Sequence, residues 1–387
     1  RYLPSGHLVY VQAGGLFAAP MDPSRLELTG PGVPMLEEVL FDPRFGGAQV
    51  DVSRTGTLVY VPGKPALPNL SVRWLDHTGQ TAPLLAKPGN YFWPRLSPDG
   101  KSLALSAAGD KNDDIWIYDW QRDTMSRLTF GPNNNRDQVW SPDGKYIAFA
   151  SGTGPDLNLY WIRSDRVGEP ERLIETKNLQ IPYSFSPDGK WLAFYERDGS
   201  GGGTPTTSPP ADIWVLPIHV EASAGPRPGK PEVFLRTPFN EVQPVFSPDG
   251  RWLAYASDES GVMEVYVRSF PGRGGHRQIS SGGGLFPVWS QKGRELFYRT
   301  LDNRILVAAY AATGDSLVAE KPRVWSETRI ADTATLWPNF DLAPDGKRFA
   351  VMMPEEGRGQ EKRPTQVAVL LNFFDELVRR ASARGGL

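Results

Sequence analysis

The sequence predicts an all-β fold built from repeated four-stranded sheets, and three observations carry this prediction. First, a Ser-Pro-Asp-Gly turn followed by an apolar strand recurs along the chain, most clearly at residues 141–150. Second, eight glycines in this setting follow one another at intervals of 43 to 61 residues. Third, 40 Gly and 36 Pro among 387 residues indicate many turns rather than long helices. Such a period is typical of a β-propeller, so we predict eight blades, with seven as the alternative.

The turn at residues 141–144 explains why each copy begins with a hairpin. Pro142 presets φ at the second position, and Gly144 tolerates the left-handed backbone that closes a three-residue loop. The residues that follow, 146–150, are aromatic, β-branched or small, as in a buried strand. We predict that the aspartate of each turn bonds the local backbone and does no acid chemistry. These aspartates are Asp99, Asp143, Asp188, Asp249 and Asp345.

The predicted copies divide the chain into one propeller domain, residues 1–372, and a C-terminal helix with its tail, residues 373–387. The copies span about residues 1–47, 48–88, 89–131, 132–176, 177–237, 238–281, 282–333 and 334–372. Residues 366–371 are predicted as the third strand of the last copy, and Asn372 as the cap of the helix. We expect this helix to pack on the rim of the last blade. Residues 198–211, rich in Gly, Ser, Thr and Pro, are predicted as a mobile loop.

Composition narrows the possible functions. The net charge of −2 argues against a nucleic-acid platform, which would carry a basic patch. The sequence has no run of about 18 apolar residues, so we expect no membrane span in this chain. It also has no cysteine, which excludes disulfides and thiolate metal sites. Export suits this composition, and a cytoplasmic location is the alternative.

Catalytic and metal-binding motifs are not found in the sequence. It contains no G-x-S-x-G elbow, H-E-x-x-H helix or phosphate-binding glycine loop. The four histidines, His7, His77, His219 and His276, belong to different copies. Residues 110–114 read D-x-N-x-D but lack the glycine and glutamate of a calcium loop, so we predict a polar hairpin loop there. We expect no enzyme activity, cofactor or metal.

The most informative positions come just before the innermost strands, because these segments ring the mouth of a propeller channel. Aromatic rings mixed with amides and a few charges gather there, a combination that can hold a peptide or a sugar. The alternative is that these groups only satisfy the loops and close the channel. We also expect Trp93 and Trp337 to tolerate alanine without loss of fold, with weaker ligand binding. The candidate ligand-binding residues are Tyr91, Trp93, Asn135, Arg136, Asp137, Gln180, Tyr183, Asn240, Glu241, Gln243, Phe286, Trp337 and Asn339.

The repeat S-P-D-G-[KR]-x-[IL]-A, followed by [DE]-[IV]-[WY]-[IV], resembles the WD40-like propeller repeat of the TolB family. Residues 2–10 and 369–377 look like the propeller segments of receptor-like bacterial serine/threonine kinases. The resemblance implies an extracytoplasmic sensing or protein-binding module, on the periplasmic or extracellular side of a bacterial membrane and tethered by an upstream segment. It carries over no catalytic residue. The Ser-Pro-Asp pattern is lost at Arg54-Thr55 and Gln291-Lys292, so those turns can differ in shape.

We therefore expect a non-enzymatic propeller that binds a protein, a peptide or a small molecule at its mouth, and no nucleic acid. One rival is the propeller module of a hydrolase or a TolB-like lyase. A hydrolase would need a separate α/β domain with its own serine, and residues 373–387 are too few to supply one. The other rival is a structural scaffold in an envelope complex.

Overall fold

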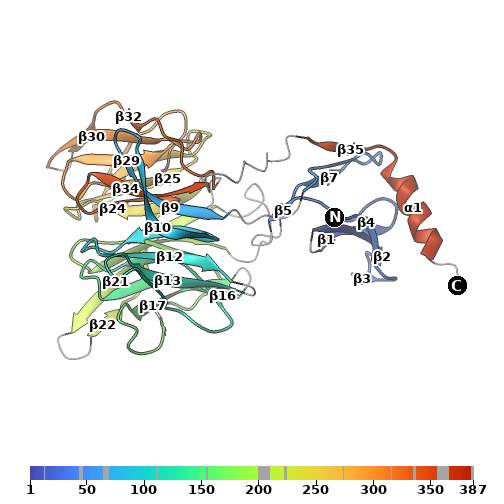
Figure 1. Cartoon of the computed structure of the whole chain (residues 1–387), viewed down its shortest axis with the longest axis horizontal. Coiled ribbons are helices and arrows are strands. Elements are labelled where there is room, and N and C mark those ends of the chain that lie inside the picture. Colours follow the sequence, from blue (N-terminus) through green and yellow to red (C-terminus); the bar gives the residue numbers. More distant parts are fainter. Residues whose placement is uncertain are drawn as a thin grey trace. The chain divides into compact units, whose positions relative to one another are not determined.

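The chain folds into two compact units (Figure 1). We call Asn69–Glu355 the ring unit, and Arg1–Pro68 with Glu356–Leu387 the terminal unit. The computed structural model describes residues 1–12, 14–42, 47–63, 69–109, 112–153, 156–198, 210–221, 225–272, 274–314, 316–333, 337–354 and 366–384. Most of the predicted mobile loop, residues 199–209, and the start of the predicted hairpin loop, residues 110–111, lie outside the described residues.

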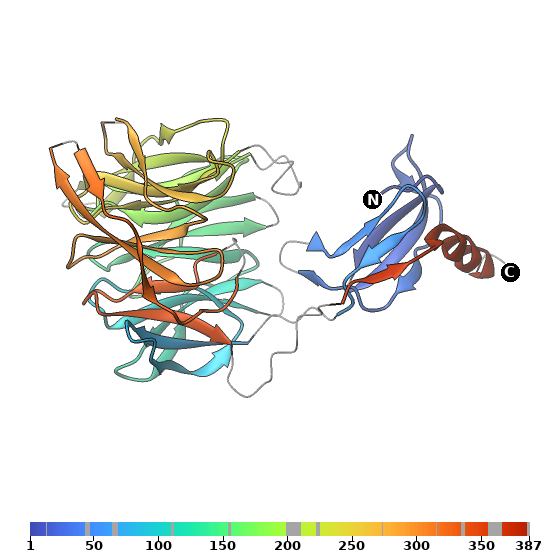
Figure 2. The same cartoon turned by 90° about the horizontal axis from the view of Figure 1, so that it is seen from above.

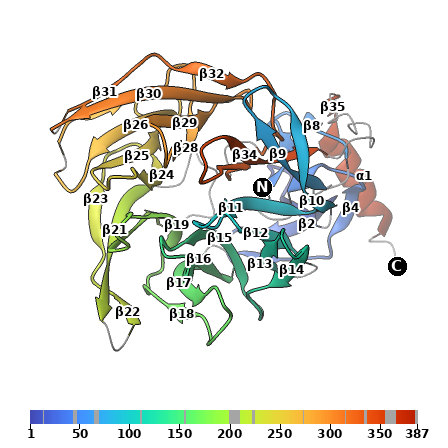
Figure 3. The ribbon, with the colours of Figure 1, turned by 60° about the vertical axis from the view of Figure 1, so that its left-hand side comes forward.

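In its described part the ring unit holds six sheets arranged radially, with the first strand of each nearest the centre (Figure 3). Blade 1 has β11 (Tyr91–Leu96), β12 (Ser102–Ala108), β13 (Asp113–Asp119) and β14 (Thr124–Arg127). Blade 2 has β15 (Asn134–Trp140), β16 (Tyr146–Thr153), β17 (Asp156–Arg163) and β18 (Glu171–Arg172). Blade 3 has β19 (Leu179–Phe185), β20 (Trp191–Arg197), β21 (Asp212–Glu221), β22 (Gly225–Pro228) and β23 (Glu232–Leu235).

The remaining three blades complete the ring unit. Blade 4 has β24 (Glu241–Phe246), β25 (Trp252–Ser257), β26 (Glu264–Ser269) and β27 (His276–Gln278). Blade 5 has β28 (Leu285–Trp289), β29 (Glu295–Arg299), β30 (Ile305–Thr313), β31 (Ser316–Ala319) and β32 (Arg323–Ser326). Blade 6 has β33 (Phe340–Leu342), β34 (Arg348–Pro354), β9 (Leu70–Asp76) and β10 (Thr81–Gly89). Blade 6 therefore joins strands from both ends of the unit, since β34 pairs with β9 from Arg348↔Asp76 to Pro354↔Leu70.

The predicted turns are confirmed at the start of the blades. In the turn of blade 2, the Gly144 amide donates to the Ser141 carbonyl oxygen at 2.9 Å, and Gly144 has φ +69°. The Asp143 carboxylate accepts the Ser141 hydroxyl at 2.7 Å and the Lys145 amide at 3.1 Å. Each of the other four turn aspartates accepts the amide two residues on. The turn aspartates therefore bond the local backbone, as predicted.

Apolar side chains on both faces of the inner strands form the core between blades. All six residues of β25 are buried, which explains its continuous apolar sequence. Between blades 2 and 3, Ala148 and Leu159 pack in one cluster with Leu192 and Leu216. Neighbouring sheets thus bury each other's faces around the ring.

The terminal unit has a separate core. Its sheets comprise β1 (His7–Gln12), β2 (Gly15–Asp22), β3 (Glu27–Leu28) and β4 (Val33–Leu36); β5 (Phe41–Asp42) and β6 (Gly47–Ala48); and β7 (Val50–Val52), β8 (Leu58–Tyr60) and β35 (Ala368–Leu370) (Figure 2). Helix α1 (Phe373–Arg384) buries Phe373 and Leu377 in a cluster with Leu16 and Leu58. The helix forms directly after Asn372, as predicted. It packs in the terminal unit, however, and not on the rim of a blade.

The blade count and the single propeller domain need correction. We predicted eight blades, or seven, over residues 1–372, but the described ring unit has six sheets and begins near residue 69. The physical reason is strand partnership. The third strand of the last copy, now β35, pairs with β8 from the second copy, while β9 of that second copy pairs with β34. The first copy, together with β7, β8 and β35, builds the terminal unit.

Candidate functional site

The innermost strands of the ring unit share a β-bulge near the position that the sequence singled out. Trp93, Asp137, Gln243 and Phe286, each seven residues before a turn glycine, have φ between +55° and +62°. The strand register shifts at each of these residues. A bulge of this kind re-aims a side chain at the cost of backbone strain. In blade 3 the place belongs to Pro182, whose ring keeps φ negative, and the register still shifts after it.

The aromatic candidates fill the centre of the ring unit. The Trp93 ring lies 5.1 Å from that of Tyr183, and the Phe92 ring lies 5.8 Å from that of Trp337. Trp93 is only 2% exposed, Phe286 is also 2% exposed, and Trp337 is 7% exposed. Truncating Trp93 or Trp337 would therefore leave a cavity and lower the stability of the ring unit.

Polar candidates at the hub bind neighbouring blades together. The Gln243 side-chain oxygen in blade 4 accepts the Phe286 amide of blade 5 at 2.6 Å. The amide of Leu96 in blade 1 donates to Asp341 of blade 6 at 2.7 Å. The Asn339 side chain donates to the Ala331 carbonyl oxygen. Gln243 and Asn339 thus satisfy buried backbone groups, as the alternative for these residues stated.

Burial also shifts the charges at the hub. Burial raises the pKa of Asp137 to about 6, which the nearby Arg136 and Arg95 only partly oppose. Burial raises the pKa of Asp341 to about 6 against the same Arg95. Arg299 has its pKa lowered by burial to about 10, with its guanidinium 4.6 Å from the centre of the Phe286 ring.

The remaining candidates include three partly exposed side chains. Asn135 is buried and accepts the Ser151 hydroxyl at 2.8 Å. Arg136 is half-buried beside Asp137, at 3.7 Å. Tyr91 and Asn240 are also partly exposed, and Asn240 donates to Asp258 at 2.7 Å. Solvent therefore reaches Tyr91, Arg136 and Asn240 but hardly reaches the hub.

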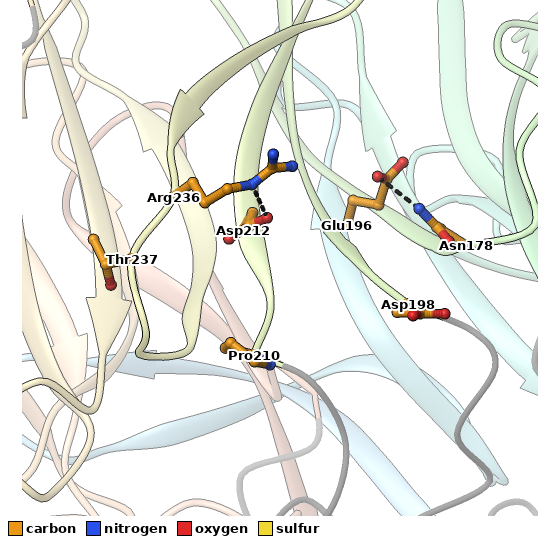
Figure 4. A pocket seen from close by; sticks show the side chains of 7 residues that line it. All are labelled: Asn178, Glu196, Asp198, Pro210, Asp212, Arg236 and Thr237. Carbon is orange, nitrogen blue, oxygen red and sulfur yellow. Dashed lines mark hydrogen bonds and ion pairs between the residues drawn. The ribbon is translucent and has the colours of Figure 1, made fainter.

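A pocket of about 320 Å³ opens at the end of blade 3 where its innermost strand begins (Figure 4). We call this end of the ring unit the mouth end. The pocket is lined by Asn178, Glu196, Asp198, Pro210, Asp212, Arg236 and Thr237. Arg236 Nε donates to Asp212 at 2.6 Å, and Asn178 Nδ2 donates to Glu196 at 2.9 Å.

Three sequence-predicted residues lie directly behind this pocket. Gln180 donates to the lining Glu196 at 2.8 Å, and the hydroxyl of the lining Thr237 donates to Glu241. The amide of Ala211, between lining Pro210 and Asp212, donates to Asn240 at 3.3 Å. Burial, followed by the nearby charge of Asp212, raises the pKa of Glu241 to about 7. The adjoining ends of blades 3 and 4 therefore bring together Gln180, Asn240 and Glu241, while most other candidates belong to the hub.

Sequence inspection missed the lining residues Glu196, Asp212 and Arg236. Their signal is a departure from the repeat. Seven residues after the turn glycine, blades 2 and 4 have Ser151 and Ser257, where blade 3 has Glu196. Comparing the copies at that fixed offset would have found it.

The described ranges contain neither a candidate metal cluster nor a candidate membrane-spanning helix. Nowhere in them do three His, Asp or Glu side chains meet in a way that could hold a metal ion. None of the described helical segments is both long and apolar enough to cross a membrane.

The radial sheets, the Ser-Pro-Asp-Gly turns and the bulged inner strands define this class of protein as a β-propeller. Residues 49–205 match the family model described as the TolB beta propeller domain. A solved structure of a provisionally assigned TolB from Agrobacterium tumefaciens is similar in fold, with TM-score 0.53 and 21% identity over 74% of this chain and 99% of that one.

Two curated relatives match parts of the chain. The uncharacterised peptidase YuxL of Bacillus subtilis is 27% identical over 210 residues, 45% of this chain and 31% of its own length. The uncharacterised protein Atu1656 of Agrobacterium fabrum is 31% identical over 147 residues, 38% of this chain and 50% of its own length. The chain thus spans only a third to a half of these relatives.

Proposed function

We propose that this propeller is a binding module that recognises a peptide segment of a partner at the mouth end of blade 3. The proposal rests on the pocket lined by residues from Asn178 to Thr237. Its lining is polar and charged, and buried amide and carboxyl groups lie behind it. Phe239, two residues beyond Thr237, is 41% exposed and offers an apolar contact next to it. A charged pocket beside an exposed ring suits an extended peptide, whose polar and apolar groups alternate.

A filled pocket tests this proposal. We expect display of random peptides against the protein to enrich sequences that no longer bind Asn178→Trp, because the indole occupies the pocket. Asn133→Trp is the matched control, since Asn133 and Asn178 both stand eleven residues before a turn glycine. Enriched peptides that bind both variants equally, or no enrichment at all, would contradict the proposal.

The proposal includes an extracytoplasmic sensing role on the outer side of a bacterial membrane. Its support is the similarity to TolB-type propellers over residues 49–205 and the resemblance of the chain ends to kinase sensor segments. Fusing alkaline phosphatase to the native gene product tests the location, because that reporter is active only after export. An inactive fusion that accumulates in the cytoplasm would refute this part.

A peptidase module is the second candidate function, favoured by the similarity to YuxL over 210 residues. In this case the propeller would admit peptides to a catalytic domain. Mass spectrometry of peptides incubated with the protein separates the two functions. Binding without cleavage supports the binding module, whereas cleavage that a serine-directed inhibitor abolishes supports the peptidase.

A further inference from the structure

The pocket arises where blade 3 departs from a pattern that blades 1 and 4 share. In blade 1 the second residue of the third strand is Asp114, which is buried and accepts the Thr129 hydroxyl at 2.9 Å. In blade 4 the same place holds Glu264, which accepts the Ser280 hydroxyl at 2.5 Å and the Gly283 amide at 2.9 Å. Each carboxylate therefore serves the internal structure of its own blade.

In blade 3 the corresponding acid is Asp212, and Arg236 stands where the hydroxyl residue should be. The register aligns them, because Ile213 pairs with Leu235 just as Ile115 and Val265 bond the residues before Thr129 and Ser280. A guanidinium cannot accept the amide proton that those hydroxyl groups accept. Arg236 instead extends toward solvent and pairs with Asp212 at its edge, so the corner opens into the pocket.

A second substitution adds negative charge to the same corner. The cross-strand pair Asn135↔Ser151 of blade 2 becomes Gln180↔Glu196 in blade 3. The longer Glu196 side chain reaches the pocket and is held there by Gln180 and Asn178. The lining then has three carboxylates, from Glu196, Asp198 and Asp212, against one guanidinium. An anionic ligand would be repelled, and a cationic one attracted.

Two buried oxygen atoms that can accept hydrogen bonds lie behind the pocket. Gln180 Oε1 and Glu241 Oε2 have no hydrogen-bond partner among the described residues, and both side chains are only 1% exposed. Gln180 is bonded to the lining Glu196, and Glu241 to the lining Thr237. Gln180 and Glu241 do not line the pocket themselves, so they form a buried polar layer behind the side chains that face it.

We propose that this pocket binds a cationic N–H donor of the peptide ligand: its terminal ammonium or the side chain of a lysine or arginine. Glu196 and Asp212 receive the charge, and Asp212 exchanges part of its contact with Arg236 for the new cation. The inference rests on the proposed function, because it names the chemical group that the peptide presents to blade 3.

Four short peptides of one neutral sequence, labelled with a fluorophore, test the inference by anisotropy. The first has a free amino terminus, and the second is acetylated and carries one lysine. The third is acetylated without a lysine, and the fourth is acetylated with a glutamate. We expect the first or the second to bind at least about tenfold more tightly than the third, and the fourth to bind weakest. The stronger of the first two identifies the source of the cation.

Variants then assign the preference to the pocket. Glu196→Gln should remove most of the difference between the cationic and neutral peptides. Glu175→Gln removes the same charge from an exposed side chain of blade 2, where Glu175 pairs with Arg172, and should leave the difference intact. Equal binding of the cationic and neutral peptides, or an unchanged preference in Glu196→Gln, overturns the inference but not the peptide-binding function. No binding by any of the four overturns both.

Discussion

Trp93 combines a left-handed backbone with nearly complete burial, so the surroundings fix both its main chain and its ring. Its indole packs against Tyr183, and its carbonyl oxygen accepts the Gln138 side chain of blade 2 at 2.5 Å. Trp93→Ala should lower the free energy of unfolding by about 3–5 kcal/mol, because a large cavity opens at the hub. Phe130→Ala is the control, since that ring is 67% exposed. Equal denaturation midpoints for the two variants would refute this structural role.

Asp137 makes the stability of the folded protein depend on pH. Its pKa is raised to about 6 in the folded protein from a usual value of 3.8, with burial as the main cause. The folded state therefore holds this proton longer than the unfolded state, and the contribution to stability falls as pH rises between these two values. The charged groups around it are Arg136, Arg95 and Asp113.

Measuring the free energy of unfolding from about pH 4 to about pH 7 tests this pH dependence, because that range covers both the ordinary and the raised pKa of Asp137. Asp137→Asn should show a flatter fall in stability with rising pH than the unmodified protein. Asp341, whose pKa is also raised to about 6 by burial, contributes a fall of the same sign. Parallel curves for the variant and the unmodified protein would show that Asp137 does not titrate in this range.

At the scale of elements, blades 1 to 4 and blade 6 each depend on a turn whose glycine has a left-handed backbone. Gly144 has φ +69°, and a β-carbon added to it would meet only Pro98, at 3.9 Å, so the substitution causes backbone strain rather than a clash. Gly144→Ala should therefore cost about 1 kcal/mol of stability. Gly275→Ala is the control, because that glycine has no positive φ and no atom within 4 Å of the added carbon. The check is the denaturation midpoint, and a loss as large in Gly275→Ala would remove the argument.

Local elements were predictable from the sequence because turn chemistry is local. The Ser-Pro-Asp-Gly turns, the apolar inner strands and the helix after Asn372 all follow from residues within a few positions of each other. The sequence marked the bulged position by its fixed distance, seven residues before the turn glycine. It did not predict that this position is buried, because burial depends on how neighbouring blades pack at the hub. Glu196 and Arg236 were missed because they become informative only when they are compared with the residues at the equivalent positions of other blades.

The exchange of strand partners belongs to the whole molecule, and the sequence could not decide it. β8 and β9 both carry apolar residues at alternate positions, and β35 could extend either sheet by its composition. Partnership depends on which closure buries more apolar area, a sum over residues far apart in the chain. In the structure β8 pairs with β35, and β9 pairs with β34. In the sequence, the ring unit is therefore inserted between β8 and β35, which are neighbouring strands of one sheet in the terminal unit.

This topology predicts that residues 69–354 fold alone. Every sheet of the ring unit draws its strands from this range, including blade 6, where β9 pairs with β34 over seven residues. The core of the terminal unit, with Leu16, Leu58 and Phe373, contains no residue of that range. An isolated fragment should therefore give a cooperative thermal transition and a β-rich circular dichroism spectrum. If residues 1–60 instead supplied blades to one eight-bladed ring, the fragment would leave that ring open and would aggregate or remain unfolded.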